Sequence, residues 1–445
     1  MNTPIWDFVR KYADSDATRL HMPGHKGKGV LLDFEKYDIT EIYGADSLFD
    51  ATGVIKESEA NLSTLFDTGE SFYSCEGSSL CVRAMLYLAR LNTGESRGYI
   101  LASRNAHRSL ISASALLDFD IEWLYQPSED SYLKCEITPE ALQKKLGECA
   151  KKPFCVYVTS PDYLGNIADI KGLARVCEEN GTLLVVDNAH GAYLRFLESD
   201  IHPITLGAHM CCDSAHKTLP TLTGGAYLHI SKKAPTELAS CAKDALALFA
   251  TTSPSYLILS SLDKVNEYLD TSYKERLASF IARLSALKAR LATYGYEIMD
   301  TEPLKIVIRA TSYGYTGEEL GAEIEKHGLV WEMRDKDFLV LMLTPENDEN
   351  DLNKIERAFS KIERRAKITH PVLDFAPPKR AMSIREAVMS KKETLPIKEA
   401  RGRACARICT FCPPAVSLVV AGEIINDSII DALEFYGFDT IEVCK

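Results

Sequence analysis

The stretch Thr182-Leu183-Leu184-Val185-Val186-Asp187 decides the fold of this chain. Four apolar residues follow one another without interruption, and a carboxylate comes directly after them. A continuous apolar run of this length predicts a strand that is buried on both faces, as in a parallel sheet covered by helices. The residues before it, Ile170–Glu179, have the apolar spacing of a helix, so the run closes a helix–strand unit.

The same alternation extends over most of residues 41–262. The expected strands are Ser71–Cys75, Tyr99–Ser103, Ile121–Tyr125, Phe154–Thr159, Thr182–Val186, Met210–Asp213 and Gly225–Ile230. The expected helices include Val54–Phe66, a helix that opens at Gly77-Ser78-Ser79, Ser109–Leu117, Pro139–Cys149 and Ile170–Glu179. Strands that alternate with helices at this spacing predict an α/β fold with a mostly parallel sheet.

Changes in composition divide the chain into four predicted parts. Residues 1–40 form a glycine-rich N-terminal arm, and residues 41–262 form the large domain. A long helix is expected from Ser260 to about Tyr294. A smaller α/β domain is expected over residues 263–370, with strands near Leu304–Arg309, Leu329–Met333 and Phe338–Leu343. A proline- and charge-rich stretch then leads into a C-terminal domain, residues 371–445.

Charge and composition narrow the class of protein. The 63 acidic and 51 basic residues of this 445-residue chain give a formal net charge of −12, which argues against nucleic acid as a partner and is compatible with a cationic small molecule. We expect no membrane span and no secretory signal. Thirteen cysteines in such a chain are expected to be reduced thiols, which predicts a cytoplasmic protein.

One cysteine cluster, Cys405-x3-Cys409-x2-Cys412, has the spacing of a radical-SAM iron–sulfur motif. Too few residues follow Cys412 to build a barrel after the motif, and Pro413 and Pro414 come directly behind it. Buried thiols without a metal are the simpler interpretation, so no metal site is predicted.

Polar residues follow several expected strands, where ligands bind in open parallel sheets. Ser78 and Ser79 open a helix after a strand, which suits an anion or a plain N-cap. His107, in Arg104-Asn105-Ala106-His107-Arg108-Ser109, could stack on an aromatic ligand, act as an acid or base, or be a satisfied surface residue. These two positions leave both interpretations open.

Two further charged residues complete the pattern. Asp187 closes a buried strand and therefore needs a cationic partner, which a salt bridge or a protonated ring nitrogen could supply. Lys217, in Asp213-Ser214-Ala215-His216-Lys217-Thr218, is either a solvated charge or the amine that binds a cofactor covalently. An anion site, a stacking histidine, an aspartate and a lysine in this order are what pyridoxal phosphate requires.

With these motifs the chain resembles the ornithine/lysine/arginine decarboxylases, fold-type-I pyridoxal-phosphate enzymes, in the shorter form without an N-terminal wing domain. The resemblance covers nearly the whole chain. It rests on Pro23-Gly24-His25-Lys26-Gly27, Arg104-Asn105-Ala106-His107-Arg108-Ser109, Val186-Asp187-Asn188-Ala189-His190-Gly191, Ser214-Ala215-His216-Lys217-Thr218-Leu219, Thr252-Ser253-Pro254-Ser255-Tyr256 and Trp331-Glu332-Met333.

The resemblance implies a role for each matching residue. Lys217 would form the Schiff base with pyridoxal phosphate, Asp187 would pair with the ring nitrogen, and His107 would stack on the ring. The remaining cofactor-binding residues would be Ala189 on the other ring face, Ser78, Ser79, Ser214 and His216 at the phosphate, His190 near the ring oxygen or the substrate carboxylate, and Thr251 from a neighbouring subunit. A homodimer or higher homo-oligomer with the active site at its interface would follow.

The implied reaction is decarboxylation of arginine, lysine or ornithine to an amine, a step of polyamine biosynthesis. A fold-type-I aminotransferase, another lyase or a catalytically impaired paralogue remain alternatives. Glu332 and Asp46 are candidates for binding the distal cation of the substrate. The chain departs from the family pattern at three places: at Glu76, at Asp162, and in the C-terminal segment Cys412–Ser417 with Ala421–Glu423.

Overall fold

The computed structural model describes residues 1–126, 131–408 and 415–445. These residues form two compact units, each assembled from separate parts of the chain. The first unit comprises Met1–Ser96, Ala150–Val158 and Ile170–Glu275, and the second comprises Arg97–Cys149, Thr159–Asp169 and Arg276–Lys445. The domain boundaries at residues 40, 262 and 370 stay predictions.

The sheet strands of the first unit follow the order β1-β7-β6-β5-β4. They are β1 (Glu70–Ser74), β7 (Ala226–Ile230), β6 (Met210–Asp213), β5 (Leu183–Asp187) and β4 (Cys155–Thr159). The first four residues of β4 belong to this unit, and Thr159 belongs to the second. Strands β5 and β6 are parallel, while β7 runs antiparallel to both β1 and β6. All five residues of β5 are buried, as the apolar run predicts.

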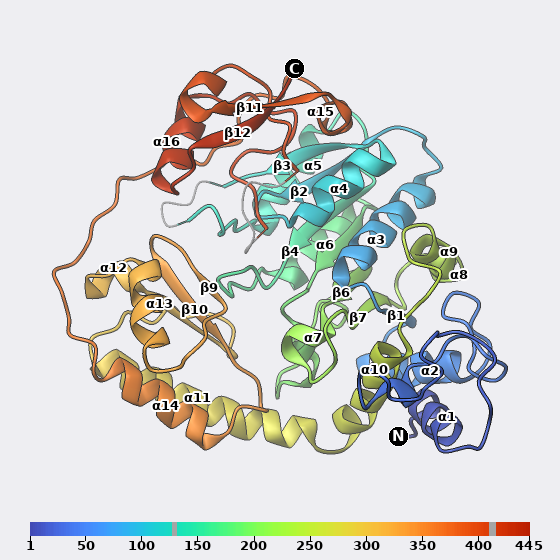
Figure 1. Ribbon diagram of the computed structural model, residues 1–445. Helices are drawn as coiled ribbons and strands as arrows, with labels where there is room; N and C mark the ends of the chain where they lie inside the picture. The colour runs from blue at the N-terminus through green and yellow to red at the C-terminus, as the bar shows by residue number, and fades with distance from the viewer. Residues whose placement is uncertain (127–130, 409–414) are drawn as a thin grey trace. The chain divides into compact units, whose positions relative to one another are not determined.

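Helices pack against this sheet (Figure 1). Helix α3 (Ser78–Thr93) packs against β1, β5, β6 and β7, and α6 (Ile170–Glu179) packs against β5. The other helical elements of the unit are α1 (Pro4–Ala13), η1 (Glu35–Tyr37), α2 (Val54–Phe66), η2 (Ala192–Phe196), α7 (Ala215–Thr218), α8 (Thr236–Ser240), α9 (Ala242–Ala247), α10 (Tyr256–Tyr268) and the π-helical turn η3 (Leu269–Tyr273).

The second unit contains three groups of strands. Strands β2 (Tyr99–Ser103) and β3 (Asp120–Leu124) are parallel neighbours. A small antiparallel sheet has the order β8-β10-β9, with β8 (Lys305–Arg309), β10 (Phe338–Met342) and β9 (Met333–Arg334). Strands β11 (Lys392–Pro396) and β12 (Thr440–Cys444) form an antiparallel pair near the C-terminus. The parallel pairs β2–β3 and β5–β6 agree with the predicted α/β class.

Helices lie beside each group of strands in the second unit (Figure 1). They are α4 (Arg108–Leu117), α5 (Pro139–Glu148), the long α11 (Lys274–Thr293), α12 (Ala310–Tyr313), α13 (Gly317–Glu325), α14 (Glu349–Phe359), α15 (Ile384–Met389), η4 (Ile397–Ala400) and α16 (Asp427–Phe435). A continuous buried cluster joins residues of the small sheet, such as Val307 and Val340, to residues of the C-terminal part, such as Ile425 and Val443.

Two sequence expectations differ from the structure. The expected strand Leu329–Met333 begins only at Met333, because Gly328 takes a left-handed conformation and Val330 is exposed instead of packed. The expected helix from Ser260 to Tyr294 is interrupted at η3, where one turn is π-helical. Among the described residues, no helix combines the length and apolar character that a membrane crossing needs.

Candidate active site

Lys217 lies in the first unit, in the one-turn helix α7 that follows strand β6. The four residues of β6 are buried, so the backbone leading to this lysine is well packed. Lys217 is partly buried, and its Nζ lies 3.0 Å from Nε2 of His190. An amine held against an imidazole in this way differs from a lysine that extends into water.

Asp187 ends the neighbouring parallel strand β5 and is only 3% exposed. Its carboxylate accepts a hydrogen bond from the Tyr157 hydroxyl at 2.9 Å and one from the Ala189 N–H at 3.2 Å. Cys212 also directs its thiol at this carboxylate, with Sγ 3.7 Å away. Burial and the adjacent Asp187 raise the pKa of Tyr157 far above its usual value, so Tyr157 remains a neutral donor.

Ser78 and Ser214 bring two loops of the first unit together at the N-terminus of α3. The Ser214 hydroxyl donates to Ser78 Oγ at 2.8 Å, and Ser79 lies in the same first turn of α3. Gly77 precedes this turn with a φ of +71° and donates its N–H to the Gly224 carbonyl at 2.8 Å. Hydroxyls beside the positive end of a 16-residue helix suit an anionic group.

His216 and Thr251 lie at the edges of the same unit. His216 Nδ1 donates to the Gly225 carbonyl at 2.9 Å, because a carbonyl can only accept. Burial lowers the pKa of His216, so its imidazole is neutral at neutral pH. Thr251 is exposed, and its N–H donates to the carboxylate of Glu76 at 2.7 Å. Glu76, at which the chain departs from the family pattern, therefore holds the loop that carries Thr251.

A buried network behind Lys217 and Asp187 was missed by sequence reasoning. The Asp213 carboxylate accepts hydrogen bonds from Asn188 Nδ2 (2.6 Å), His202 Nε2 (3.1 Å) and His229 Nε2 (3.3 Å). Burial alone would raise the pKa of Asp213, but the two imidazoles outweigh it and lower that pKa. Asp213 precedes Ser214 and Asn188 follows Asp187, so the network fixes both loops. The sequence signal that could have revealed this network is Met210–Asp213, a second apolar strand that ends in a carboxylate.

The cluster of His202, Cys211 and Asp213 has the residue types of a metal site, and its candidate ligand atoms lie within 4.8 Å of one another. However, His202 Nδ1 accepts the Ile204 N–H at 3.4 Å, which leaves the proton on Nε2. His202 therefore donates to Asp213, and the cluster is a hydrogen-bonded network.

His107 belongs to the second unit, where it is the N-cap of helix α4. Its Nδ1 accepts the Ser109 N–H at 3.2 Å and lies 2.9 Å from Ser109 Oγ. Because Nδ1 accepts, the neutral imidazole carries its proton on Nε2. The structure thus brings together Lys217, His190, Asp187, Ala189, Ser78 and Ser214 in one unit and holds His107 in the other.

Asp46 and Glu332, the two candidates for binding the distal cation of the substrate, differ in their hydrogen-bond partners. The carboxylate of Asp46 accepts backbone N–H groups of Ser47, Thr52, Gly53 and Ile55 at 2.8–3.1 Å, so it holds its own loop in place. Burial raises the pKa of Asp46, but the hydrogen bonds from these amides outweigh burial, so the pKa lies below its usual value. Glu332 accepts one hydrogen bond from the Tyr163 hydroxyl at 2.9 Å and lines a cleft with Trp331 and Asp351.

Of the three clustered cysteines, Cys409 and Cys412 lie outside the described residues. Cys405 is buried, and burial raises its pKa to about 12. Its sulfur accepts the Arg407 N–H at 3.4 Å.

The first unit fits pyridoxal phosphate on its own chemistry. Asp187 is a buried carboxylate whose described donors are all neutral, which suits a protonated ring nitrogen as its charge partner. Lys217 offers a partly buried amine, and Ser78 with Ser214 offers hydroxyls at a helix N-terminus for a phosphate. The three features match the three polar ends of the cofactor.

Comparisons with known proteins point to one family. The family described as Orn/Lys/Arg decarboxylase, major domain, matches residues 3–296. An uncharacterised protein of Bacillus subtilis is 28% identical over 97% of this chain and 94% of its own length, and the arginine decarboxylase of the same organism is 26% identical over 96% and 92%. Lysine decarboxylase A of Pseudomonas aeruginosa shares the fold, with a TM-score of 0.82 at 16% identity over 99% of this chain and 80% of that one.

Proposed function

This chain belongs to the ornithine/lysine/arginine decarboxylase family, and we propose that Lys217, Asp187 and His107 carry its reaction. The protein is a fold-type-I, pyridoxal-phosphate-dependent decarboxylase of basic amino acids. The observation that supports the assignment of residues best is the juxtaposition of Lys217 with His190 in the unit that also holds the buried Asp187.

When bound, pyridoxal phosphate accepts the electron pair that the departing carboxylate leaves behind. Asp187 would keep a proton on the ring nitrogen, because a buried carboxylate with neutral donors is stabilised by a cation beside it. Tyr157 and the Ala189 N–H orient that carboxylate. Lys217 would hold the cofactor covalently at Nζ.

His190 lies within hydrogen-bond distance of Lys217 Nζ and can exchange a proton with it or receive the substrate carboxylate. Ser78, Ser79, Ser214 and His216 would bind the phosphate, with the helix dipole of α3 adding to the attraction. His107 would stack on the ring, and Ala189 would support its other face. This assignment gives each polar end of the cofactor a partner from this chain.

We propose Glu332 as the partner of the substrate's distal cation, since Asp46 is already engaged by four backbone amides. Tyr163 donates to one oxygen of Glu332, which fixes the carboxylate and leaves its other oxygen to accept. Glu332→Gln should raise KM for basic amino acids more than it lowers kcat. The matched control is Glu325→Gln, a change at an acid that bonds Trp331 Nε1 nearby. Equal KM values for wild type and Glu332→Gln would exclude this role.

We further propose a cytoplasmic homodimer or higher homo-oligomer in which Thr251 reaches the phosphate of a neighbouring subunit. The exposure of Thr251 and its exposed neighbours is compatible with such a role. Mixing a Lys217→Ala chain with a Thr251→Ala chain tests this directly, because a mixed dimer would regain one native site. No regain of activity on mixing would argue for Thr251 acting within its own chain.

The reaction itself is tested on the purified full chain, reconstituted with pyridoxal phosphate and given arginine, lysine and ornithine in turn. We expect equal amounts of CO2 and of the corresponding amine from one of these substrates, which would place the enzyme in polyamine biosynthesis. Formation of a keto acid without CO2 would shift the function to an aminotransferase. Cofactor binding without any product would indicate a catalytically impaired paralogue.

A further inference from the structure

The C-terminal segment 415–423 lies along the loop that carries His107, although the two are far apart in sequence. His107 and Val416 form an antiparallel β-bridge, and the Arg108 N–H donates to the Ala415 carbonyl at 2.9 Å. All of these residues belong to the second unit. The backbone at His107 and Arg108 is therefore fixed by the C-terminal segment.

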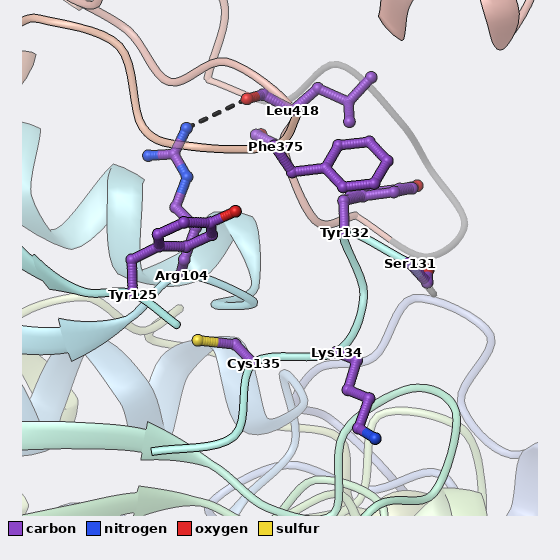
Figure 2. A pocket seen from close by; sticks show the side chains of 9 residues that line it. Arg104, Tyr125, Ser131, Tyr132, Lys134, Cys135, Phe375 and Leu418 are labelled. Atoms are coloured by element: carbon purple, nitrogen blue, oxygen red, sulfur yellow. Dashed lines mark hydrogen bonds between the residues drawn. The ribbon is translucent and has the colours of Figure 1, made fainter. Parts of the chain in front are cut away.

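A buried ion pair holds the beginning of the same loop. Arg104 directly follows strand β2, and its two terminal nitrogens donate to the two carboxylate oxygens of Glu423 at 2.6 and 2.8 Å. The side chains are 6% and 3% exposed. Arg104 also donates to the Leu418 carbonyl at 3.1 Å, the bond drawn in Figure 2. A bidentate pair of this kind fixes direction as well as distance.

Two neighbours complete the surroundings of Glu423. The indole N–H of Trp123 donates to Glu423 Oε1 at 3.2 Å, and the Val420 N–H donates to Oε2 at 2.7 Å. The guanidinium of Arg104 lies over the Trp123 ring, 4.7 Å from its centroid. Figure 2 shows Arg104 reaching from the strand end, beside Tyr125, toward Leu418. The carboxylate thus accepts four hydrogen bonds, and a buried pair with saturated partners sets a single arrangement.

We propose that Glu423, acting through Arg104, is a positioning residue for His107. The C-terminal segment 415–423 then forms part of the active site's framework: Arg104 fixes the loop three residues before His107, and Ala415 and Val416 fix it at His107 and Arg108. The inference rests on the proposed role of His107 as the residue that stacks on the cofactor ring. A purely structural ion pair would hold the fold without affecting the ring.

A double-mutant cycle separates these two roles. Glu423→Gln keeps the size of the side chain but leaves the Arg104 charge unmatched, and a loop shift of about 1 Å should lower kcat/KM about 100-fold. The absorbance and circular dichroism of the bound cofactor should change with it. If Glu423 acts through His107, the same substitution in a His107→Ala background lowers kcat/KM no further. Glu393→Gln, which breaks the Arg403–Glu393 pair in the same C-terminal region, is the control and should leave these quantities unchanged.

Loss of folding would not count as support. The pair Arg104→Met with Glu423→Leu removes the ion pair without leaving a buried charge, so the protein should fold and still show the lowered kcat/KM. Additive losses from Glu423→Gln and His107→Ala, or a Glu423→Gln enzyme with native cofactor spectrum and native kcat/KM, would overturn the proposal. A His107→Ala enzyme with native spectrum and rate would instead overturn the proposed role of His107.

Discussion

The residues proposed to bind the cofactor are supported in two different ways in the two units. In the first unit, Asp187 and Lys217 lie at or just beyond the ends of adjacent strands, and their hydrogen-bond partners come from the strands and loops of the same sheet. In the second unit, His107 depends on a segment more than 300 residues further along, through Arg104 and Glu423. The first arrangement uses contacts within one sheet and its loops, whereas the second also needs the C-terminal segment.

The largest effect is expected at the covalent anchor of the first unit. Lys217→Ala removes the only group proposed to bind the cofactor covalently, so decarboxylation should fall to the background level in a CO2-release assay. Lys232→Ala is the matched control, because Lys232 is exposed and pairs with Asp67 at the surface. A Lys217→Ala enzyme that turns over at the wild-type rate would remove Lys217 from the site.

Asp187→Asn should lower kcat by about 10²- to 10³-fold, as for the loss of one preorganised electrostatic contact. The amide can no longer hold a proton on the ring nitrogen by charge, although it fills the same space. Measured kcat at saturating cofactor and substrate checks this. An Asn variant with wild-type kcat would mean that Asp187 serves the fold alone.

A buried carboxylate in the second unit should reveal itself in stability rather than in rate. Burial raises the pKa of Asp162 to about 6 against the lowering influence of Asn166 and Lys305. The folded protein therefore keeps a proton on Asp162 that the unfolded chain releases near pH 4. The free energy of unfolding should fall between pH 4 and pH 6 by about 3 kcal/mol from this group.

Asp162→Asn removes this titration. As the pH rises from 4 to 7, the free energy of unfolding of the variant should therefore increase by about 3 kcal/mol relative to that of the wild type. Denaturant unfolding at several pH values measures the difference, and other titrating groups cancel in it. A constant difference across this range would show that Asp162 stays ionised. The contrast is with Asp213 in the first unit, whose two imidazole donors lower its pKa.

The smallest effect is expected at Tyr157, which supports Asp187 from the next strand. Tyr157→Phe removes one neutral hydrogen bond and keeps the ring, so the loss in kcat should be about fivefold, equivalent to about 1 kcal/mol. The change should leave KM for the amino acid near its wild-type value. A loss as large as that of Asp187→Asn would mean that Tyr157 itself takes part in the reaction.

Local patterns predicted the strands of the first unit and its helices α2, α3 and α6, but not the short helices α7, α8 and α9. Met210–Asp213 and Ile170–Glu179 occur as predicted, because an apolar run or a helical period is set by neighbouring residues. The positions of Asp187 and Lys217 followed from the ends of such runs. The strand predicted at Leu329–Met333 was wrong except at its last residue, since Val330 is exposed and only Met333–Arg334 pair with β10.

The supporting contacts were not visible in the sequence. Nothing in the residues around Arg104 indicates that Glu423 is its partner, because the pairing depends on how the C-terminal segment folds back within the second unit. The same holds for Asp213 with His202 and His229, which meet only when three segments of the chain pack together. Packing over long sequence separations decides these contacts.

We propose that Lys217 holds pyridoxal phosphate in this decarboxylase of basic amino acids. Borohydride reduction of the cofactor-loaded protein, followed by proteolysis and mass spectrometry, tests it most directly. We predict that the peptide containing Lys217 alone carries the reduced cofactor. Cofactor mass on a different lysine, or on no peptide of a catalytically active enzyme, would show that Lys217 is not the covalent anchor of the cofactor.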